Sequence, residues 1–177
     1  MWALVENNNV TQVFTRPKAL TIGENQYQAN IFNLWSTSEL EALGIYEVVI
    51  DNTNLKDKEY YINTNQIFTF RGGVVTASYN SATARNLDEL KTEHKERINA
   101  QAGSLLAQYD WYTLRAADGG TAVPSNVATY RAAVRSKANE MCNTIDSAPS
   151  VEHLASLYVY SGDPAARPLG DWPTLGS

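Results

Sequence analysis

The residues that most often carry out chemistry in proteins are scarce in this 177-residue sequence, which holds two histidines and one cysteine. His94 and His153 lie on different predicted helices, and Cys142 has no histidine at the spacing of a thiol–imidazole pair. A zinc site needs further Cys or His ligands at short spacing, and the sequence has none. We therefore expect no metal site and no thiol nucleophile, and we interpret His94 as a hydrogen-bonded packing residue.

Glycines and carboxylates leave one enzymatic alternative open. Gly72-Gly73 and Gly119-Gly120 lack the Lys-Ser/Thr of a phosphate-binding loop and the glycine triplet of a dinucleotide-binding loop, so we predict turns there. The 19 Asp and Glu residues could supply the carboxylate pair of a glycosidase, but the sequence singles out no two of them. The expectation is a protein that is not an enzyme and that binds no cofactor.

Three aromatic side chains stand in segments that we expect to be loops. Trp111 and Tyr112 fall in a turn predicted between two long helices, and Trp172 falls in a tail rich in proline and glycine. Aromatic side chains in such places either close the end of a core or anchor a partner. We interpret Trp111 as a plug at the end of the core, and Trp172 as a binding residue that docks back onto this protein or onto a partner.

Three arginines complete the candidate partner-binding set. Arg131 and Arg135 lie one turn apart on a predicted helix, away from its apolar stripe. They form either a solvated basic edge or a docking edge for a partner's carboxylates. Arg167 is the basic residue of the tail. The full set of candidates is Trp111, Tyr112, Arg131, Arg135, Arg167 and Trp172.

Residues 86–160 are predicted to form a helical domain that positions most of these side chains. Asn86 is a suitable N-cap, a third short helix begins at Ser150, and residues 161–177 form an extended Pro/Gly-rich C-terminal tail. Two apolar stripes with a 3.6-residue period predict two long helices packed as an antiparallel hairpin. The first stripe is Leu87, Leu90, Ile98, Ala102, Leu105 and Tyr109, with His94 in its gap, and the second is Val127, Tyr130, Val134, Ala138, Met141 and Ile145.

Residues 1–80 are predicted to form an antiparallel β domain with one short helix, which makes the fold class α+β. Short runs of β-branched and aromatic residues alternate with turn residues, a pattern typical of meandering strands. The helix is capped by Ser36 and ends at Gly44. We expect the apolar region between Tyr27 and Trp35 to be strand-like, and the small polar segment of residues 80–85 to separate the two domains.

Composition excludes several classes of partner. The net charge of −5 and the sequence pI of about 5.0 argue against nucleic acid, because phosphate contacts require a basic surface. No apolar run approaches the roughly 20 residues that span a bilayer, so no membrane partner is expected. One cysteine cannot form an internal disulfide, which suits a reducing cytoplasm. The N-terminal stretch lacks the basic region of a signal peptide.

Three segments of the helical domain form a recognisable set, namely Leu105-Leu106-Ala107-Gln108-Tyr109-Asp110-Trp111-Tyr112, Ala122-Val123-Pro124 and Tyr130-Arg131-Ala132-Ala133-Val134-Arg135. Together they resemble the helical module of tailed-phage tail fibre assembly chaperones, the phage tail assembly chaperone family. The resemblance covers residues 90–145, a third of the chain. The N-terminal stretch of residues 29–45, with Leu34-Trp35 and Gly44-Ile45, is similar to the β domain of phage tail fibre assembly proteins, and Trp172-Pro173 is similar to their C-terminal tail. One departure is Tyr109, where the family has a small polar residue before Asp-Trp.

This resemblance implies a non-enzymatic protein that binds a tail fibre polypeptide and assists its folding and trimerisation. A trimeric fibre would carry up to three copies of the helper, in the host cytoplasm during phage assembly. The alternative is a virion-associated protein that is retained at the fibre tip as an adhesin and binds receptor glycans. A small hydrolase acting on host glycans is the third hypothesis.

Overall fold

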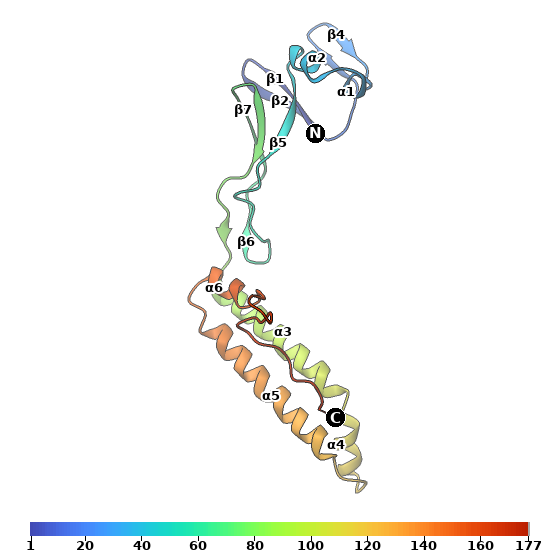
Figure 1. Ribbon diagram of the computed structural model, residues 1–177, viewed down its shortest axis with the longest axis vertical. Coiled ribbons are helices and arrows are strands. Elements are labelled where there is room, and N and C mark those ends of the chain that lie inside the picture. The colour runs from blue at the N-terminus through green and yellow to red at the C-terminus, as the bar shows by residue number, and fades with distance from the viewer. Residues whose placement is uncertain (177) are drawn as a thin grey trace. The chain divides into compact units, whose positions relative to one another are not determined.

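The computed structural model describes residues 1–176, and the chain divides into two compact units (Figure 1). The first unit covers residues 1–83 and carries the β-sheet, whereas the second begins at Ala84 and carries the long helices. The predicted α+β class is confirmed. Each unit is described by itself below.

A five-stranded sheet forms the first unit. Its strand order is β2 (Asn9–Phe14), β1 (Trp2–Glu6), β5 (Ile45–Ile50), β8 (Val74–Ser78) and β7 (Ile67–Arg71). The edge strands β2 and β7 approach one another, so the sheet curves into a half-barrel.

The expectation of a wholly antiparallel domain is wrong at one pairing, because β5 and β8 run parallel, with Val48 opposite Val75. The chain reverses direction twice between these strands. It reverses first in the long connection of residues 51–66 and again at the turn between β7 and β8, where Gly72 and Gly73 adopt positive φ. β8 therefore lies beside β5 in the same direction, and β7 takes the sheet edge.

Successive side chains along a strand point to opposite faces of the sheet, and this unit has two small cores, one on each face. The first core lies under β3 (Leu20–Ile22), β4 (Asn25–Tyr27), α1 (Ile31–Leu34) and α2 (Thr37–Ala42). The second lies inside the curve of the sheet. The remaining short strands are β6 (Tyr61–Ile62) and β9 (Thr83–Ala84). The first core comprises Leu4, Phe14, Leu20, Ile31, Phe32, Leu40 and Ile45, and the second comprises Ala3, Val48, Val75 and Ala77.

The region between Tyr27 and Trp35 differs from the expected strand, because the end of β4 is followed by helix α1. Ile31 and Phe32 are adjacent and both buried in the first core. Adjacent residues of a strand point to opposite faces, so a strand could not bury both on one side. A helical turn places them close enough together to do so.

The predicted cap and stop of α2 are confirmed. Ser36 accepts the Glu39 amide at 3.3 Å, and the Glu39 carboxylate accepts the Ser36 amide at 2.8 Å. The Ser36 hydroxyl also donates to the Glu39 carboxylate, at 2.7 Å, and this bond, together with that from the Ser36 amide, holds the pKa of the exposed Glu39 carboxyl below its usual value. Gly44 follows with a φ of +80°, and its carbonyl accepts the Val5 amide at 2.7 Å. Helix α2 is thereby fixed to β1.

Replacing Gly44 with alanine should lower the free energy of unfolding by about 2 kcal/mol. A Cβ at this position would lie 2.7 Å from the Val5 carbonyl oxygen, in addition to the cost of a positive φ. Gly73→Ala is the matched control, because Gly73 has a φ of +81° but nothing within 4 Å of its Cβ position. Urea unfolding followed by intrinsic fluorescence would compare the two. Equal losses in the two variants would show that the close approach of Val5 costs nothing.

The second unit is built on the predicted antiparallel hairpin of α3 (Leu87–Ala107) and α5 (Ser125–Asp146), which pack along their length. Asn86 caps α3 by accepting the Asp88 and Glu89 amides. The short helix α6 (Val151–Ser156) is capped by Ser150, as predicted. The buried side chains follow the predicted stripes closely. They are Leu90, His94, Ile98 and Ala102 on α3, and Val127, Tyr130, Val134, Ala138, Met141 and Ile145 on α5.

The predicted turn after Tyr109 is instead a helix, α4 (Asp110–Ala117). Asp110 stands in its first turn and Arg115 in its last, where each charge favours the helix dipole. Gly119, with a φ of +83°, then ends the helical segment. Trp111 and Tyr112 therefore lie on a helix rather than in a loop.

Residues 161–176 form an irregular segment, as predicted, that we name the strap. It folds back along α3 and α5 (dark red in Figure 1). Its first part is closed by paired backbone bonds between Ser161 and Ala166. Leu169 then donates its amide to the Leu157 carbonyl at 3.1 Å, and its side chain is 1% exposed. Leu169 thus joins the strap to the core of the helical unit.

Candidate functional site

Helix α4 presents an apolar and aromatic surface to solvent. The rings of Trp111 and Tyr112 stack at 3.7 Å, and the Arg115 guanidinium lies 4.9 Å from the Trp111 ring and 5.3 Å from the Tyr112 ring. None of the described residues 110–117 is buried, and Trp111 is 50% and Leu114 65% exposed. The interpretation of Trp111 as a core plug is therefore wrong. We call Trp111, Tyr112, Leu114 and Arg115 the α4 platform.

The aromatic junction before α4 keeps this platform in place. Tyr109 packs edge-on against Tyr130 of α5, with ring centroids 5.4 Å apart. At the other end of α4, the Arg115 carbonyl accepts the Gly120 amide at 2.9 Å. A helix of eight residues is marginal by itself, so its position depends on such ties to its neighbours.

Arg131 provides the strongest of these ties. Its guanidinium donates to the Leu106 carbonyl at 2.8 Å and pairs with the Asp110 carboxylate at 2.8 Å, and its side chain is only 11% exposed. The Leu106 carbonyl lies in the last turn of α3, where helical acceptors lack intrahelical partners. Arg131 is therefore neither a solvated edge nor a docking edge. It joins the end of α3, the start of α4 and the first half of α5.

Arg131→Ala should lower the free energy of unfolding of the helical unit by about 2 kcal/mol, because the change removes a largely covered charge and two charge-assisted bonds, one of them to a backbone carbonyl. Arg135→Ala should cost less than about 0.5 kcal/mol, because Arg135 is exposed on the same helix. Urea unfolding followed by far-ultraviolet circular dichroism would measure both. A comparable small loss in the two variants would contradict the role given to Arg131.

Arg135 is exposed and borders a shallow hollow of about 270 Å³ together with Arg131. Val123 of the α4–α5 loop and Thr113 of α4 also line this hollow. Its charge is therefore available to a partner that contacts the loop and α4 together.

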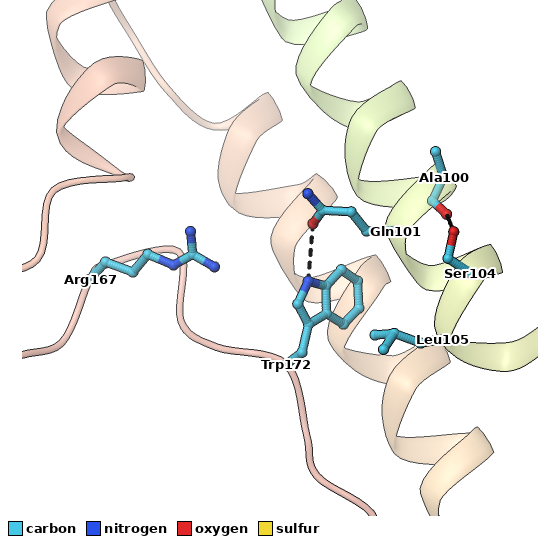
Figure 2. Close-up of a pocket in the computed structure, with 6 residues that line it drawn as sticks. All are labelled: Ala100, Gln101, Ser104, Leu105, Arg167 and Trp172. Carbon is cyan, nitrogen blue, oxygen red and sulfur yellow. Dashed lines mark hydrogen bonds between the residues drawn. The ribbon is translucent and has the colours of Figure 1, made fainter. Parts of the chain in front are cut away.

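Trp172 docks back onto this protein, one of the two alternatives given by the sequence. Its indole Nε1–H donates to the Gln101 side-chain oxygen at 3.1 Å, and its ring lies beside Leu105 (Figure 2). The ring remains half-buried and borders a hollow of about 540 Å³. Ala100, Gln101, Ser104 and Leu105 of α3 line this hollow together with Arg167 and Trp172 of the strap.

Arg167 is held by its own strap. Its Nε donates to the Gly170 carbonyl at 2.9 Å and lies 3.4 Å from the Asp171 carboxylate, while its guanidinium covers the Tyr160 ring at 5.4 Å. The Tyr160 hydroxyl donates to the same carboxylate, and this bond raises the pKa of Tyr160. Arg167 thus lines one side of the hollow that Trp172 borders (Figure 2).

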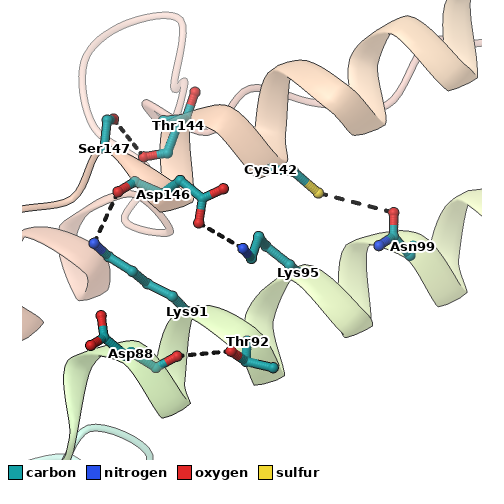
Figure 3. Close-up of polar contacts among 9 residues, drawn as sticks. All are labelled: Asp88, Lys91, Thr92, Lys95, Asn99, Cys142, Thr144, Asp146 and Ser147. Carbon is teal, nitrogen blue, oxygen red and sulfur yellow. Dashed lines mark hydrogen bonds and ion pairs between the residues drawn. The ribbon is translucent and has the colours of Figure 1, made fainter.

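Polar ties at the opposite end of the helical pair are structural. Lys91 donates to the Asp146 carbonyl at 2.9 Å, and Lys95 pairs with the Asp146 carboxylate at 2.7 Å, which raises the pKa of Lys95 (Figure 3). Two cations at the C-terminus of α5 also favour its dipole. Cys142 lies half-buried opposite Asn99, and burial raises the pKa of its thiol. A thiol with a raised pKa carries little thiolate at neutral pH, so Cys142 is expected to be unreactive.

His94 is buried on α3, and its Nδ1 lies 2.6 Å from the Tyr158 hydroxyl beyond α6. The prediction of a hydrogen-bonded packing histidine is confirmed.

Within residues 1–176, no group of three or more His, Cys, Asp or Glu side chains is arranged to hold a metal ion. The arrangement offers contact surface, with stacked rings on α4 and an open hollow on α3.

Sequence reasoning brought Trp111 and Tyr112 together correctly but missed Arg115, Gln101 and Leu169. Arg115 could have been found, because residues three and four apart on a helix face each other, and it follows Tyr112 and Trp111 at these spacings. Nothing in the local sequence indicates that Leu169 is buried or that Gln101 meets Trp172.

Among the helices of residues 1–176, none combines the length and the apolar content that crossing a bilayer requires. Comparison with protein-family models, with curated proteins and with solved structures finds no match for this chain.

Proposed function

We propose that this protein is a non-enzymatic assembly chaperone of a tailed-phage tail fibre, which binds the fibre polypeptide and assists its folding and trimerisation. The observation that carries the proposal is the α4 platform. A Trp and a Leu stand at least half-exposed on a short helix whose position is fixed by Arg131 and the Tyr109–Tyr130 contact. Rigid, exposed aromatic side chains flanked by arginine are characteristic of binding hot spots.

The resemblance to the chaperone family gains support from where its residues lie. Asp110, from the Asp-Trp pair, is bonded to Arg131, from the Tyr-Arg segment, at 2.8 Å. The neighbouring residues Tyr109 and Tyr130 contact each other as well. Segments that are about 20 residues apart in the sequence therefore form one tertiary unit that positions the platform.

The first unit supplies a second surface that suits a β-rich client. Val49 of β5, Val74 of β8 and Ile67 of β7 are exposed, and they alternate with the residues that point into the curve of the sheet. β-Branched side chains on a pleated surface pack well against another strand-rich surface. These exposed positions of β5, β7 and β8 lie on the face that carries the first core, and they would shelter apolar fibre segments.

A tail fibre needs such a helper for a physical reason. Its intertwined strands pair across chains and over long sequence separations, so they fold slowly and expose unpaired edges and apolar surface before the trimer closes. Reversible cover by a chaperone keeps these edges from aggregating. We propose that this occurs in the host cytoplasm, with up to three copies on one trimeric fibre.

Co-expression with the fibre polypeptide tests the proposal. We expect soluble fibre trimers with the protein present and insoluble fibre without it. The mass of the co-purified complex, measured by light scattering after size exclusion, would give the number of bound copies. A fibre that trimerises equally well alone would contradict the proposal. The matched control is co-expression with an inert soluble protein of similar size.

Retention on the virion as a fibre-tip adhesin is the second candidate, favoured by the exposed Trp111 ring, which stacks on the half-buried Tyr112. Flat aromatic faces of this kind can also pack against sugar rings. Presence of the protein in purified phage particles, together with glycan binding that is lost in Trp111→Ala, would favour this candidate over a chaperone that leaves.

A further inference from the structure

The strap is held unequally along its length. Its proximal part, residues 161–171, is anchored by the buried Leu169 side chain and by the bond from the Leu169 amide to the Leu157 carbonyl. The bond from Arg167 to the Gly170 carbonyl and the bond from Tyr160 to Asp171 hold the shape of this part. Its distal part, residues 172–176, is held far more weakly. Within the described residues, this part is tied by the bond from Trp172 to Gln101, and Leu175 is exposed.

The distal strap borders two open hollows, one lined by α3 and one lined by α5, and we call the surface that includes these hollows and the strap the groove. On the α3 side, the hollow of about 540 Å³ remains open beside Trp172. On the α5 side, Thr174 and Gly176 border a second hollow of about 340 Å³ together with Asn126, Thr129 and Ala133. The strap therefore lies in the groove without filling it.

The side chains that line the two hollows could bond an extended backbone. Gln101 and Asn126 each carry an amide group, which both donates and accepts, and Thr129 adds a hydroxyl. Each hollow also includes a small side chain, Ala100 in the first and Ala133 in the second, so a backbone can approach either helix closely there. The strap itself is a segment without regular secondary structure that borders both hollows.

We propose that the groove between α3 and α5 binds an extended segment of the client polypeptide, and that the distal strap covers this groove until the client displaces it. This inference rests on the proposed chaperone function. The occupant is an extended segment that carries an aromatic side chain, because the strap that occupies the groove now has that character, with Trp172 at the α3 hollow. Leu169 remains in place during the exchange, and the strap acts as a tethered competitor.

Trp172→Ala in the full chain tests the cover. Removing the anchor frees the groove, and the apparent dissociation constant for the fibre polypeptide should fall about tenfold, because a closed fraction no longer competes. The control is Leu175→Ala, an exposed residue of the same strap, for which we expect no change. An unchanged or weakened affinity in Trp172→Ala would overturn the inference.

Ala100→Trp tests the groove itself, because an indole at this exposed position fills the hollow on α3. Fibre binding should weaken about tenfold or more, because the client segment loses its space. The control is Asn139→Trp, which adds the same indole at an exposed position of α5 outside the linings of the two hollows and should leave binding unchanged. Unaltered binding in Ala100→Trp would show that the client lies elsewhere. Circular dichroism of each variant would establish that the helices are intact.

A probe that needs no fibre separates this inference from the proposed function. A synthetic peptide with the sequence of residues 170–176, Gly-Asp-Trp-Pro-Thr-Leu-Gly, should shift the Gln101 side-chain amide signals of the Trp172→Ala protein at millimolar concentration, and should shift those of the unaltered protein far less. If no variant binds fibre but the peptide behaves in this way, the proposed function fails and the groove stands. If the fibre binds but the peptide shifts neither protein, the groove assignment fails alone.

Discussion

Leu169→Ala should lower the free energy of unfolding of the helical unit by about 3 kcal/mol, because the truncation leaves a cavity in the core. The side chain is 1% exposed although it belongs to an irregular, Pro/Gly-rich segment. The loss of this anchor should also release the strap as a whole, including Trp172. Urea unfolding followed by far-ultraviolet circular dichroism would measure the change, and limited proteolysis after Arg167 would report the release of the strap.

Leu175→Ala is the matched control for this experiment. The same substitution is made in the same strap, but Leu175 is 37% exposed, and the expected loss is below about 0.5 kcal/mol. If Leu169→Ala were as mild as Leu175→Ala, the strap would be a passive surface segment. The proposed distinction between its fixed proximal part and its exchangeable distal part would then fail.

The helical pair can be predicted from the sequence because it depends on local periodicity. Every position of the second stripe, from Val127 to Ile145, is buried, and the one polar residue of the first stripe, His94, is buried as well. A long amphipathic helix has one apolar face, so the pattern determines which residues meet the partner helix. Caps such as Asn86 and Ser150 are equally local, and both are confirmed.

The sheet is less predictable because strand order is not a local property. The runs that form β5 and β8 are recognisable as strands, but nothing in either run indicates that the two are neighbours or that they run parallel. Helix α1 illustrates a second difficulty. The burial of the adjacent residues Ile31 and Phe32 against one core overrides their strand propensity.

The candidate site is the least predictable part, because exposure of a side chain depends on distant residues. The Asp-Trp-Tyr run by itself predicts a turn, with Trp111 in the core. The actual helix α4 is fixed by Arg131, whose partners Leu106 and Asp110 are more than 20 residues away in the sequence. The sequence shows only that Arg131 lies outside the apolar stripe of its helix. It does not show that the Leu106 carbonyl of α3 and the Asp110 carboxylate of α4 bind this side chain.

Trp111→Ala should weaken binding of the fibre polypeptide about a hundredfold, which corresponds to about 3 kcal/mol, if the α4 platform is the hot spot of the client surface. The ring is half-exposed and held by the stacked Tyr112 and the Arg115 guanidinium, so little conformational entropy is lost when a client covers it. The same substitution should change the stability of the unbound protein by less than about 1 kcal/mol, because none of the described residues of α4 is buried. Biolayer interferometry with immobilised fibre polypeptide would measure the affinity.

Trp35→Ala provides the matched comparison, because Trp35 is also exposed and also contacts a tyrosine ring, that of Tyr27, in the first unit. We expect its affinity for the fibre to stay within about twofold of the unaltered protein, because Trp35 lies outside the α4 platform. A large loss in Trp111→Ala with little change in Trp35→Ala would locate the recognition at α4 rather than in general surface hydrophobicity. If both variants bound the fibre as tightly as the unaltered protein, α4 would have no role in binding. The α4 platform, the observation on which the proposed function rests, would then not support that function. Arg115 would in that case only hold the rings of Trp111 and Tyr112 against α4.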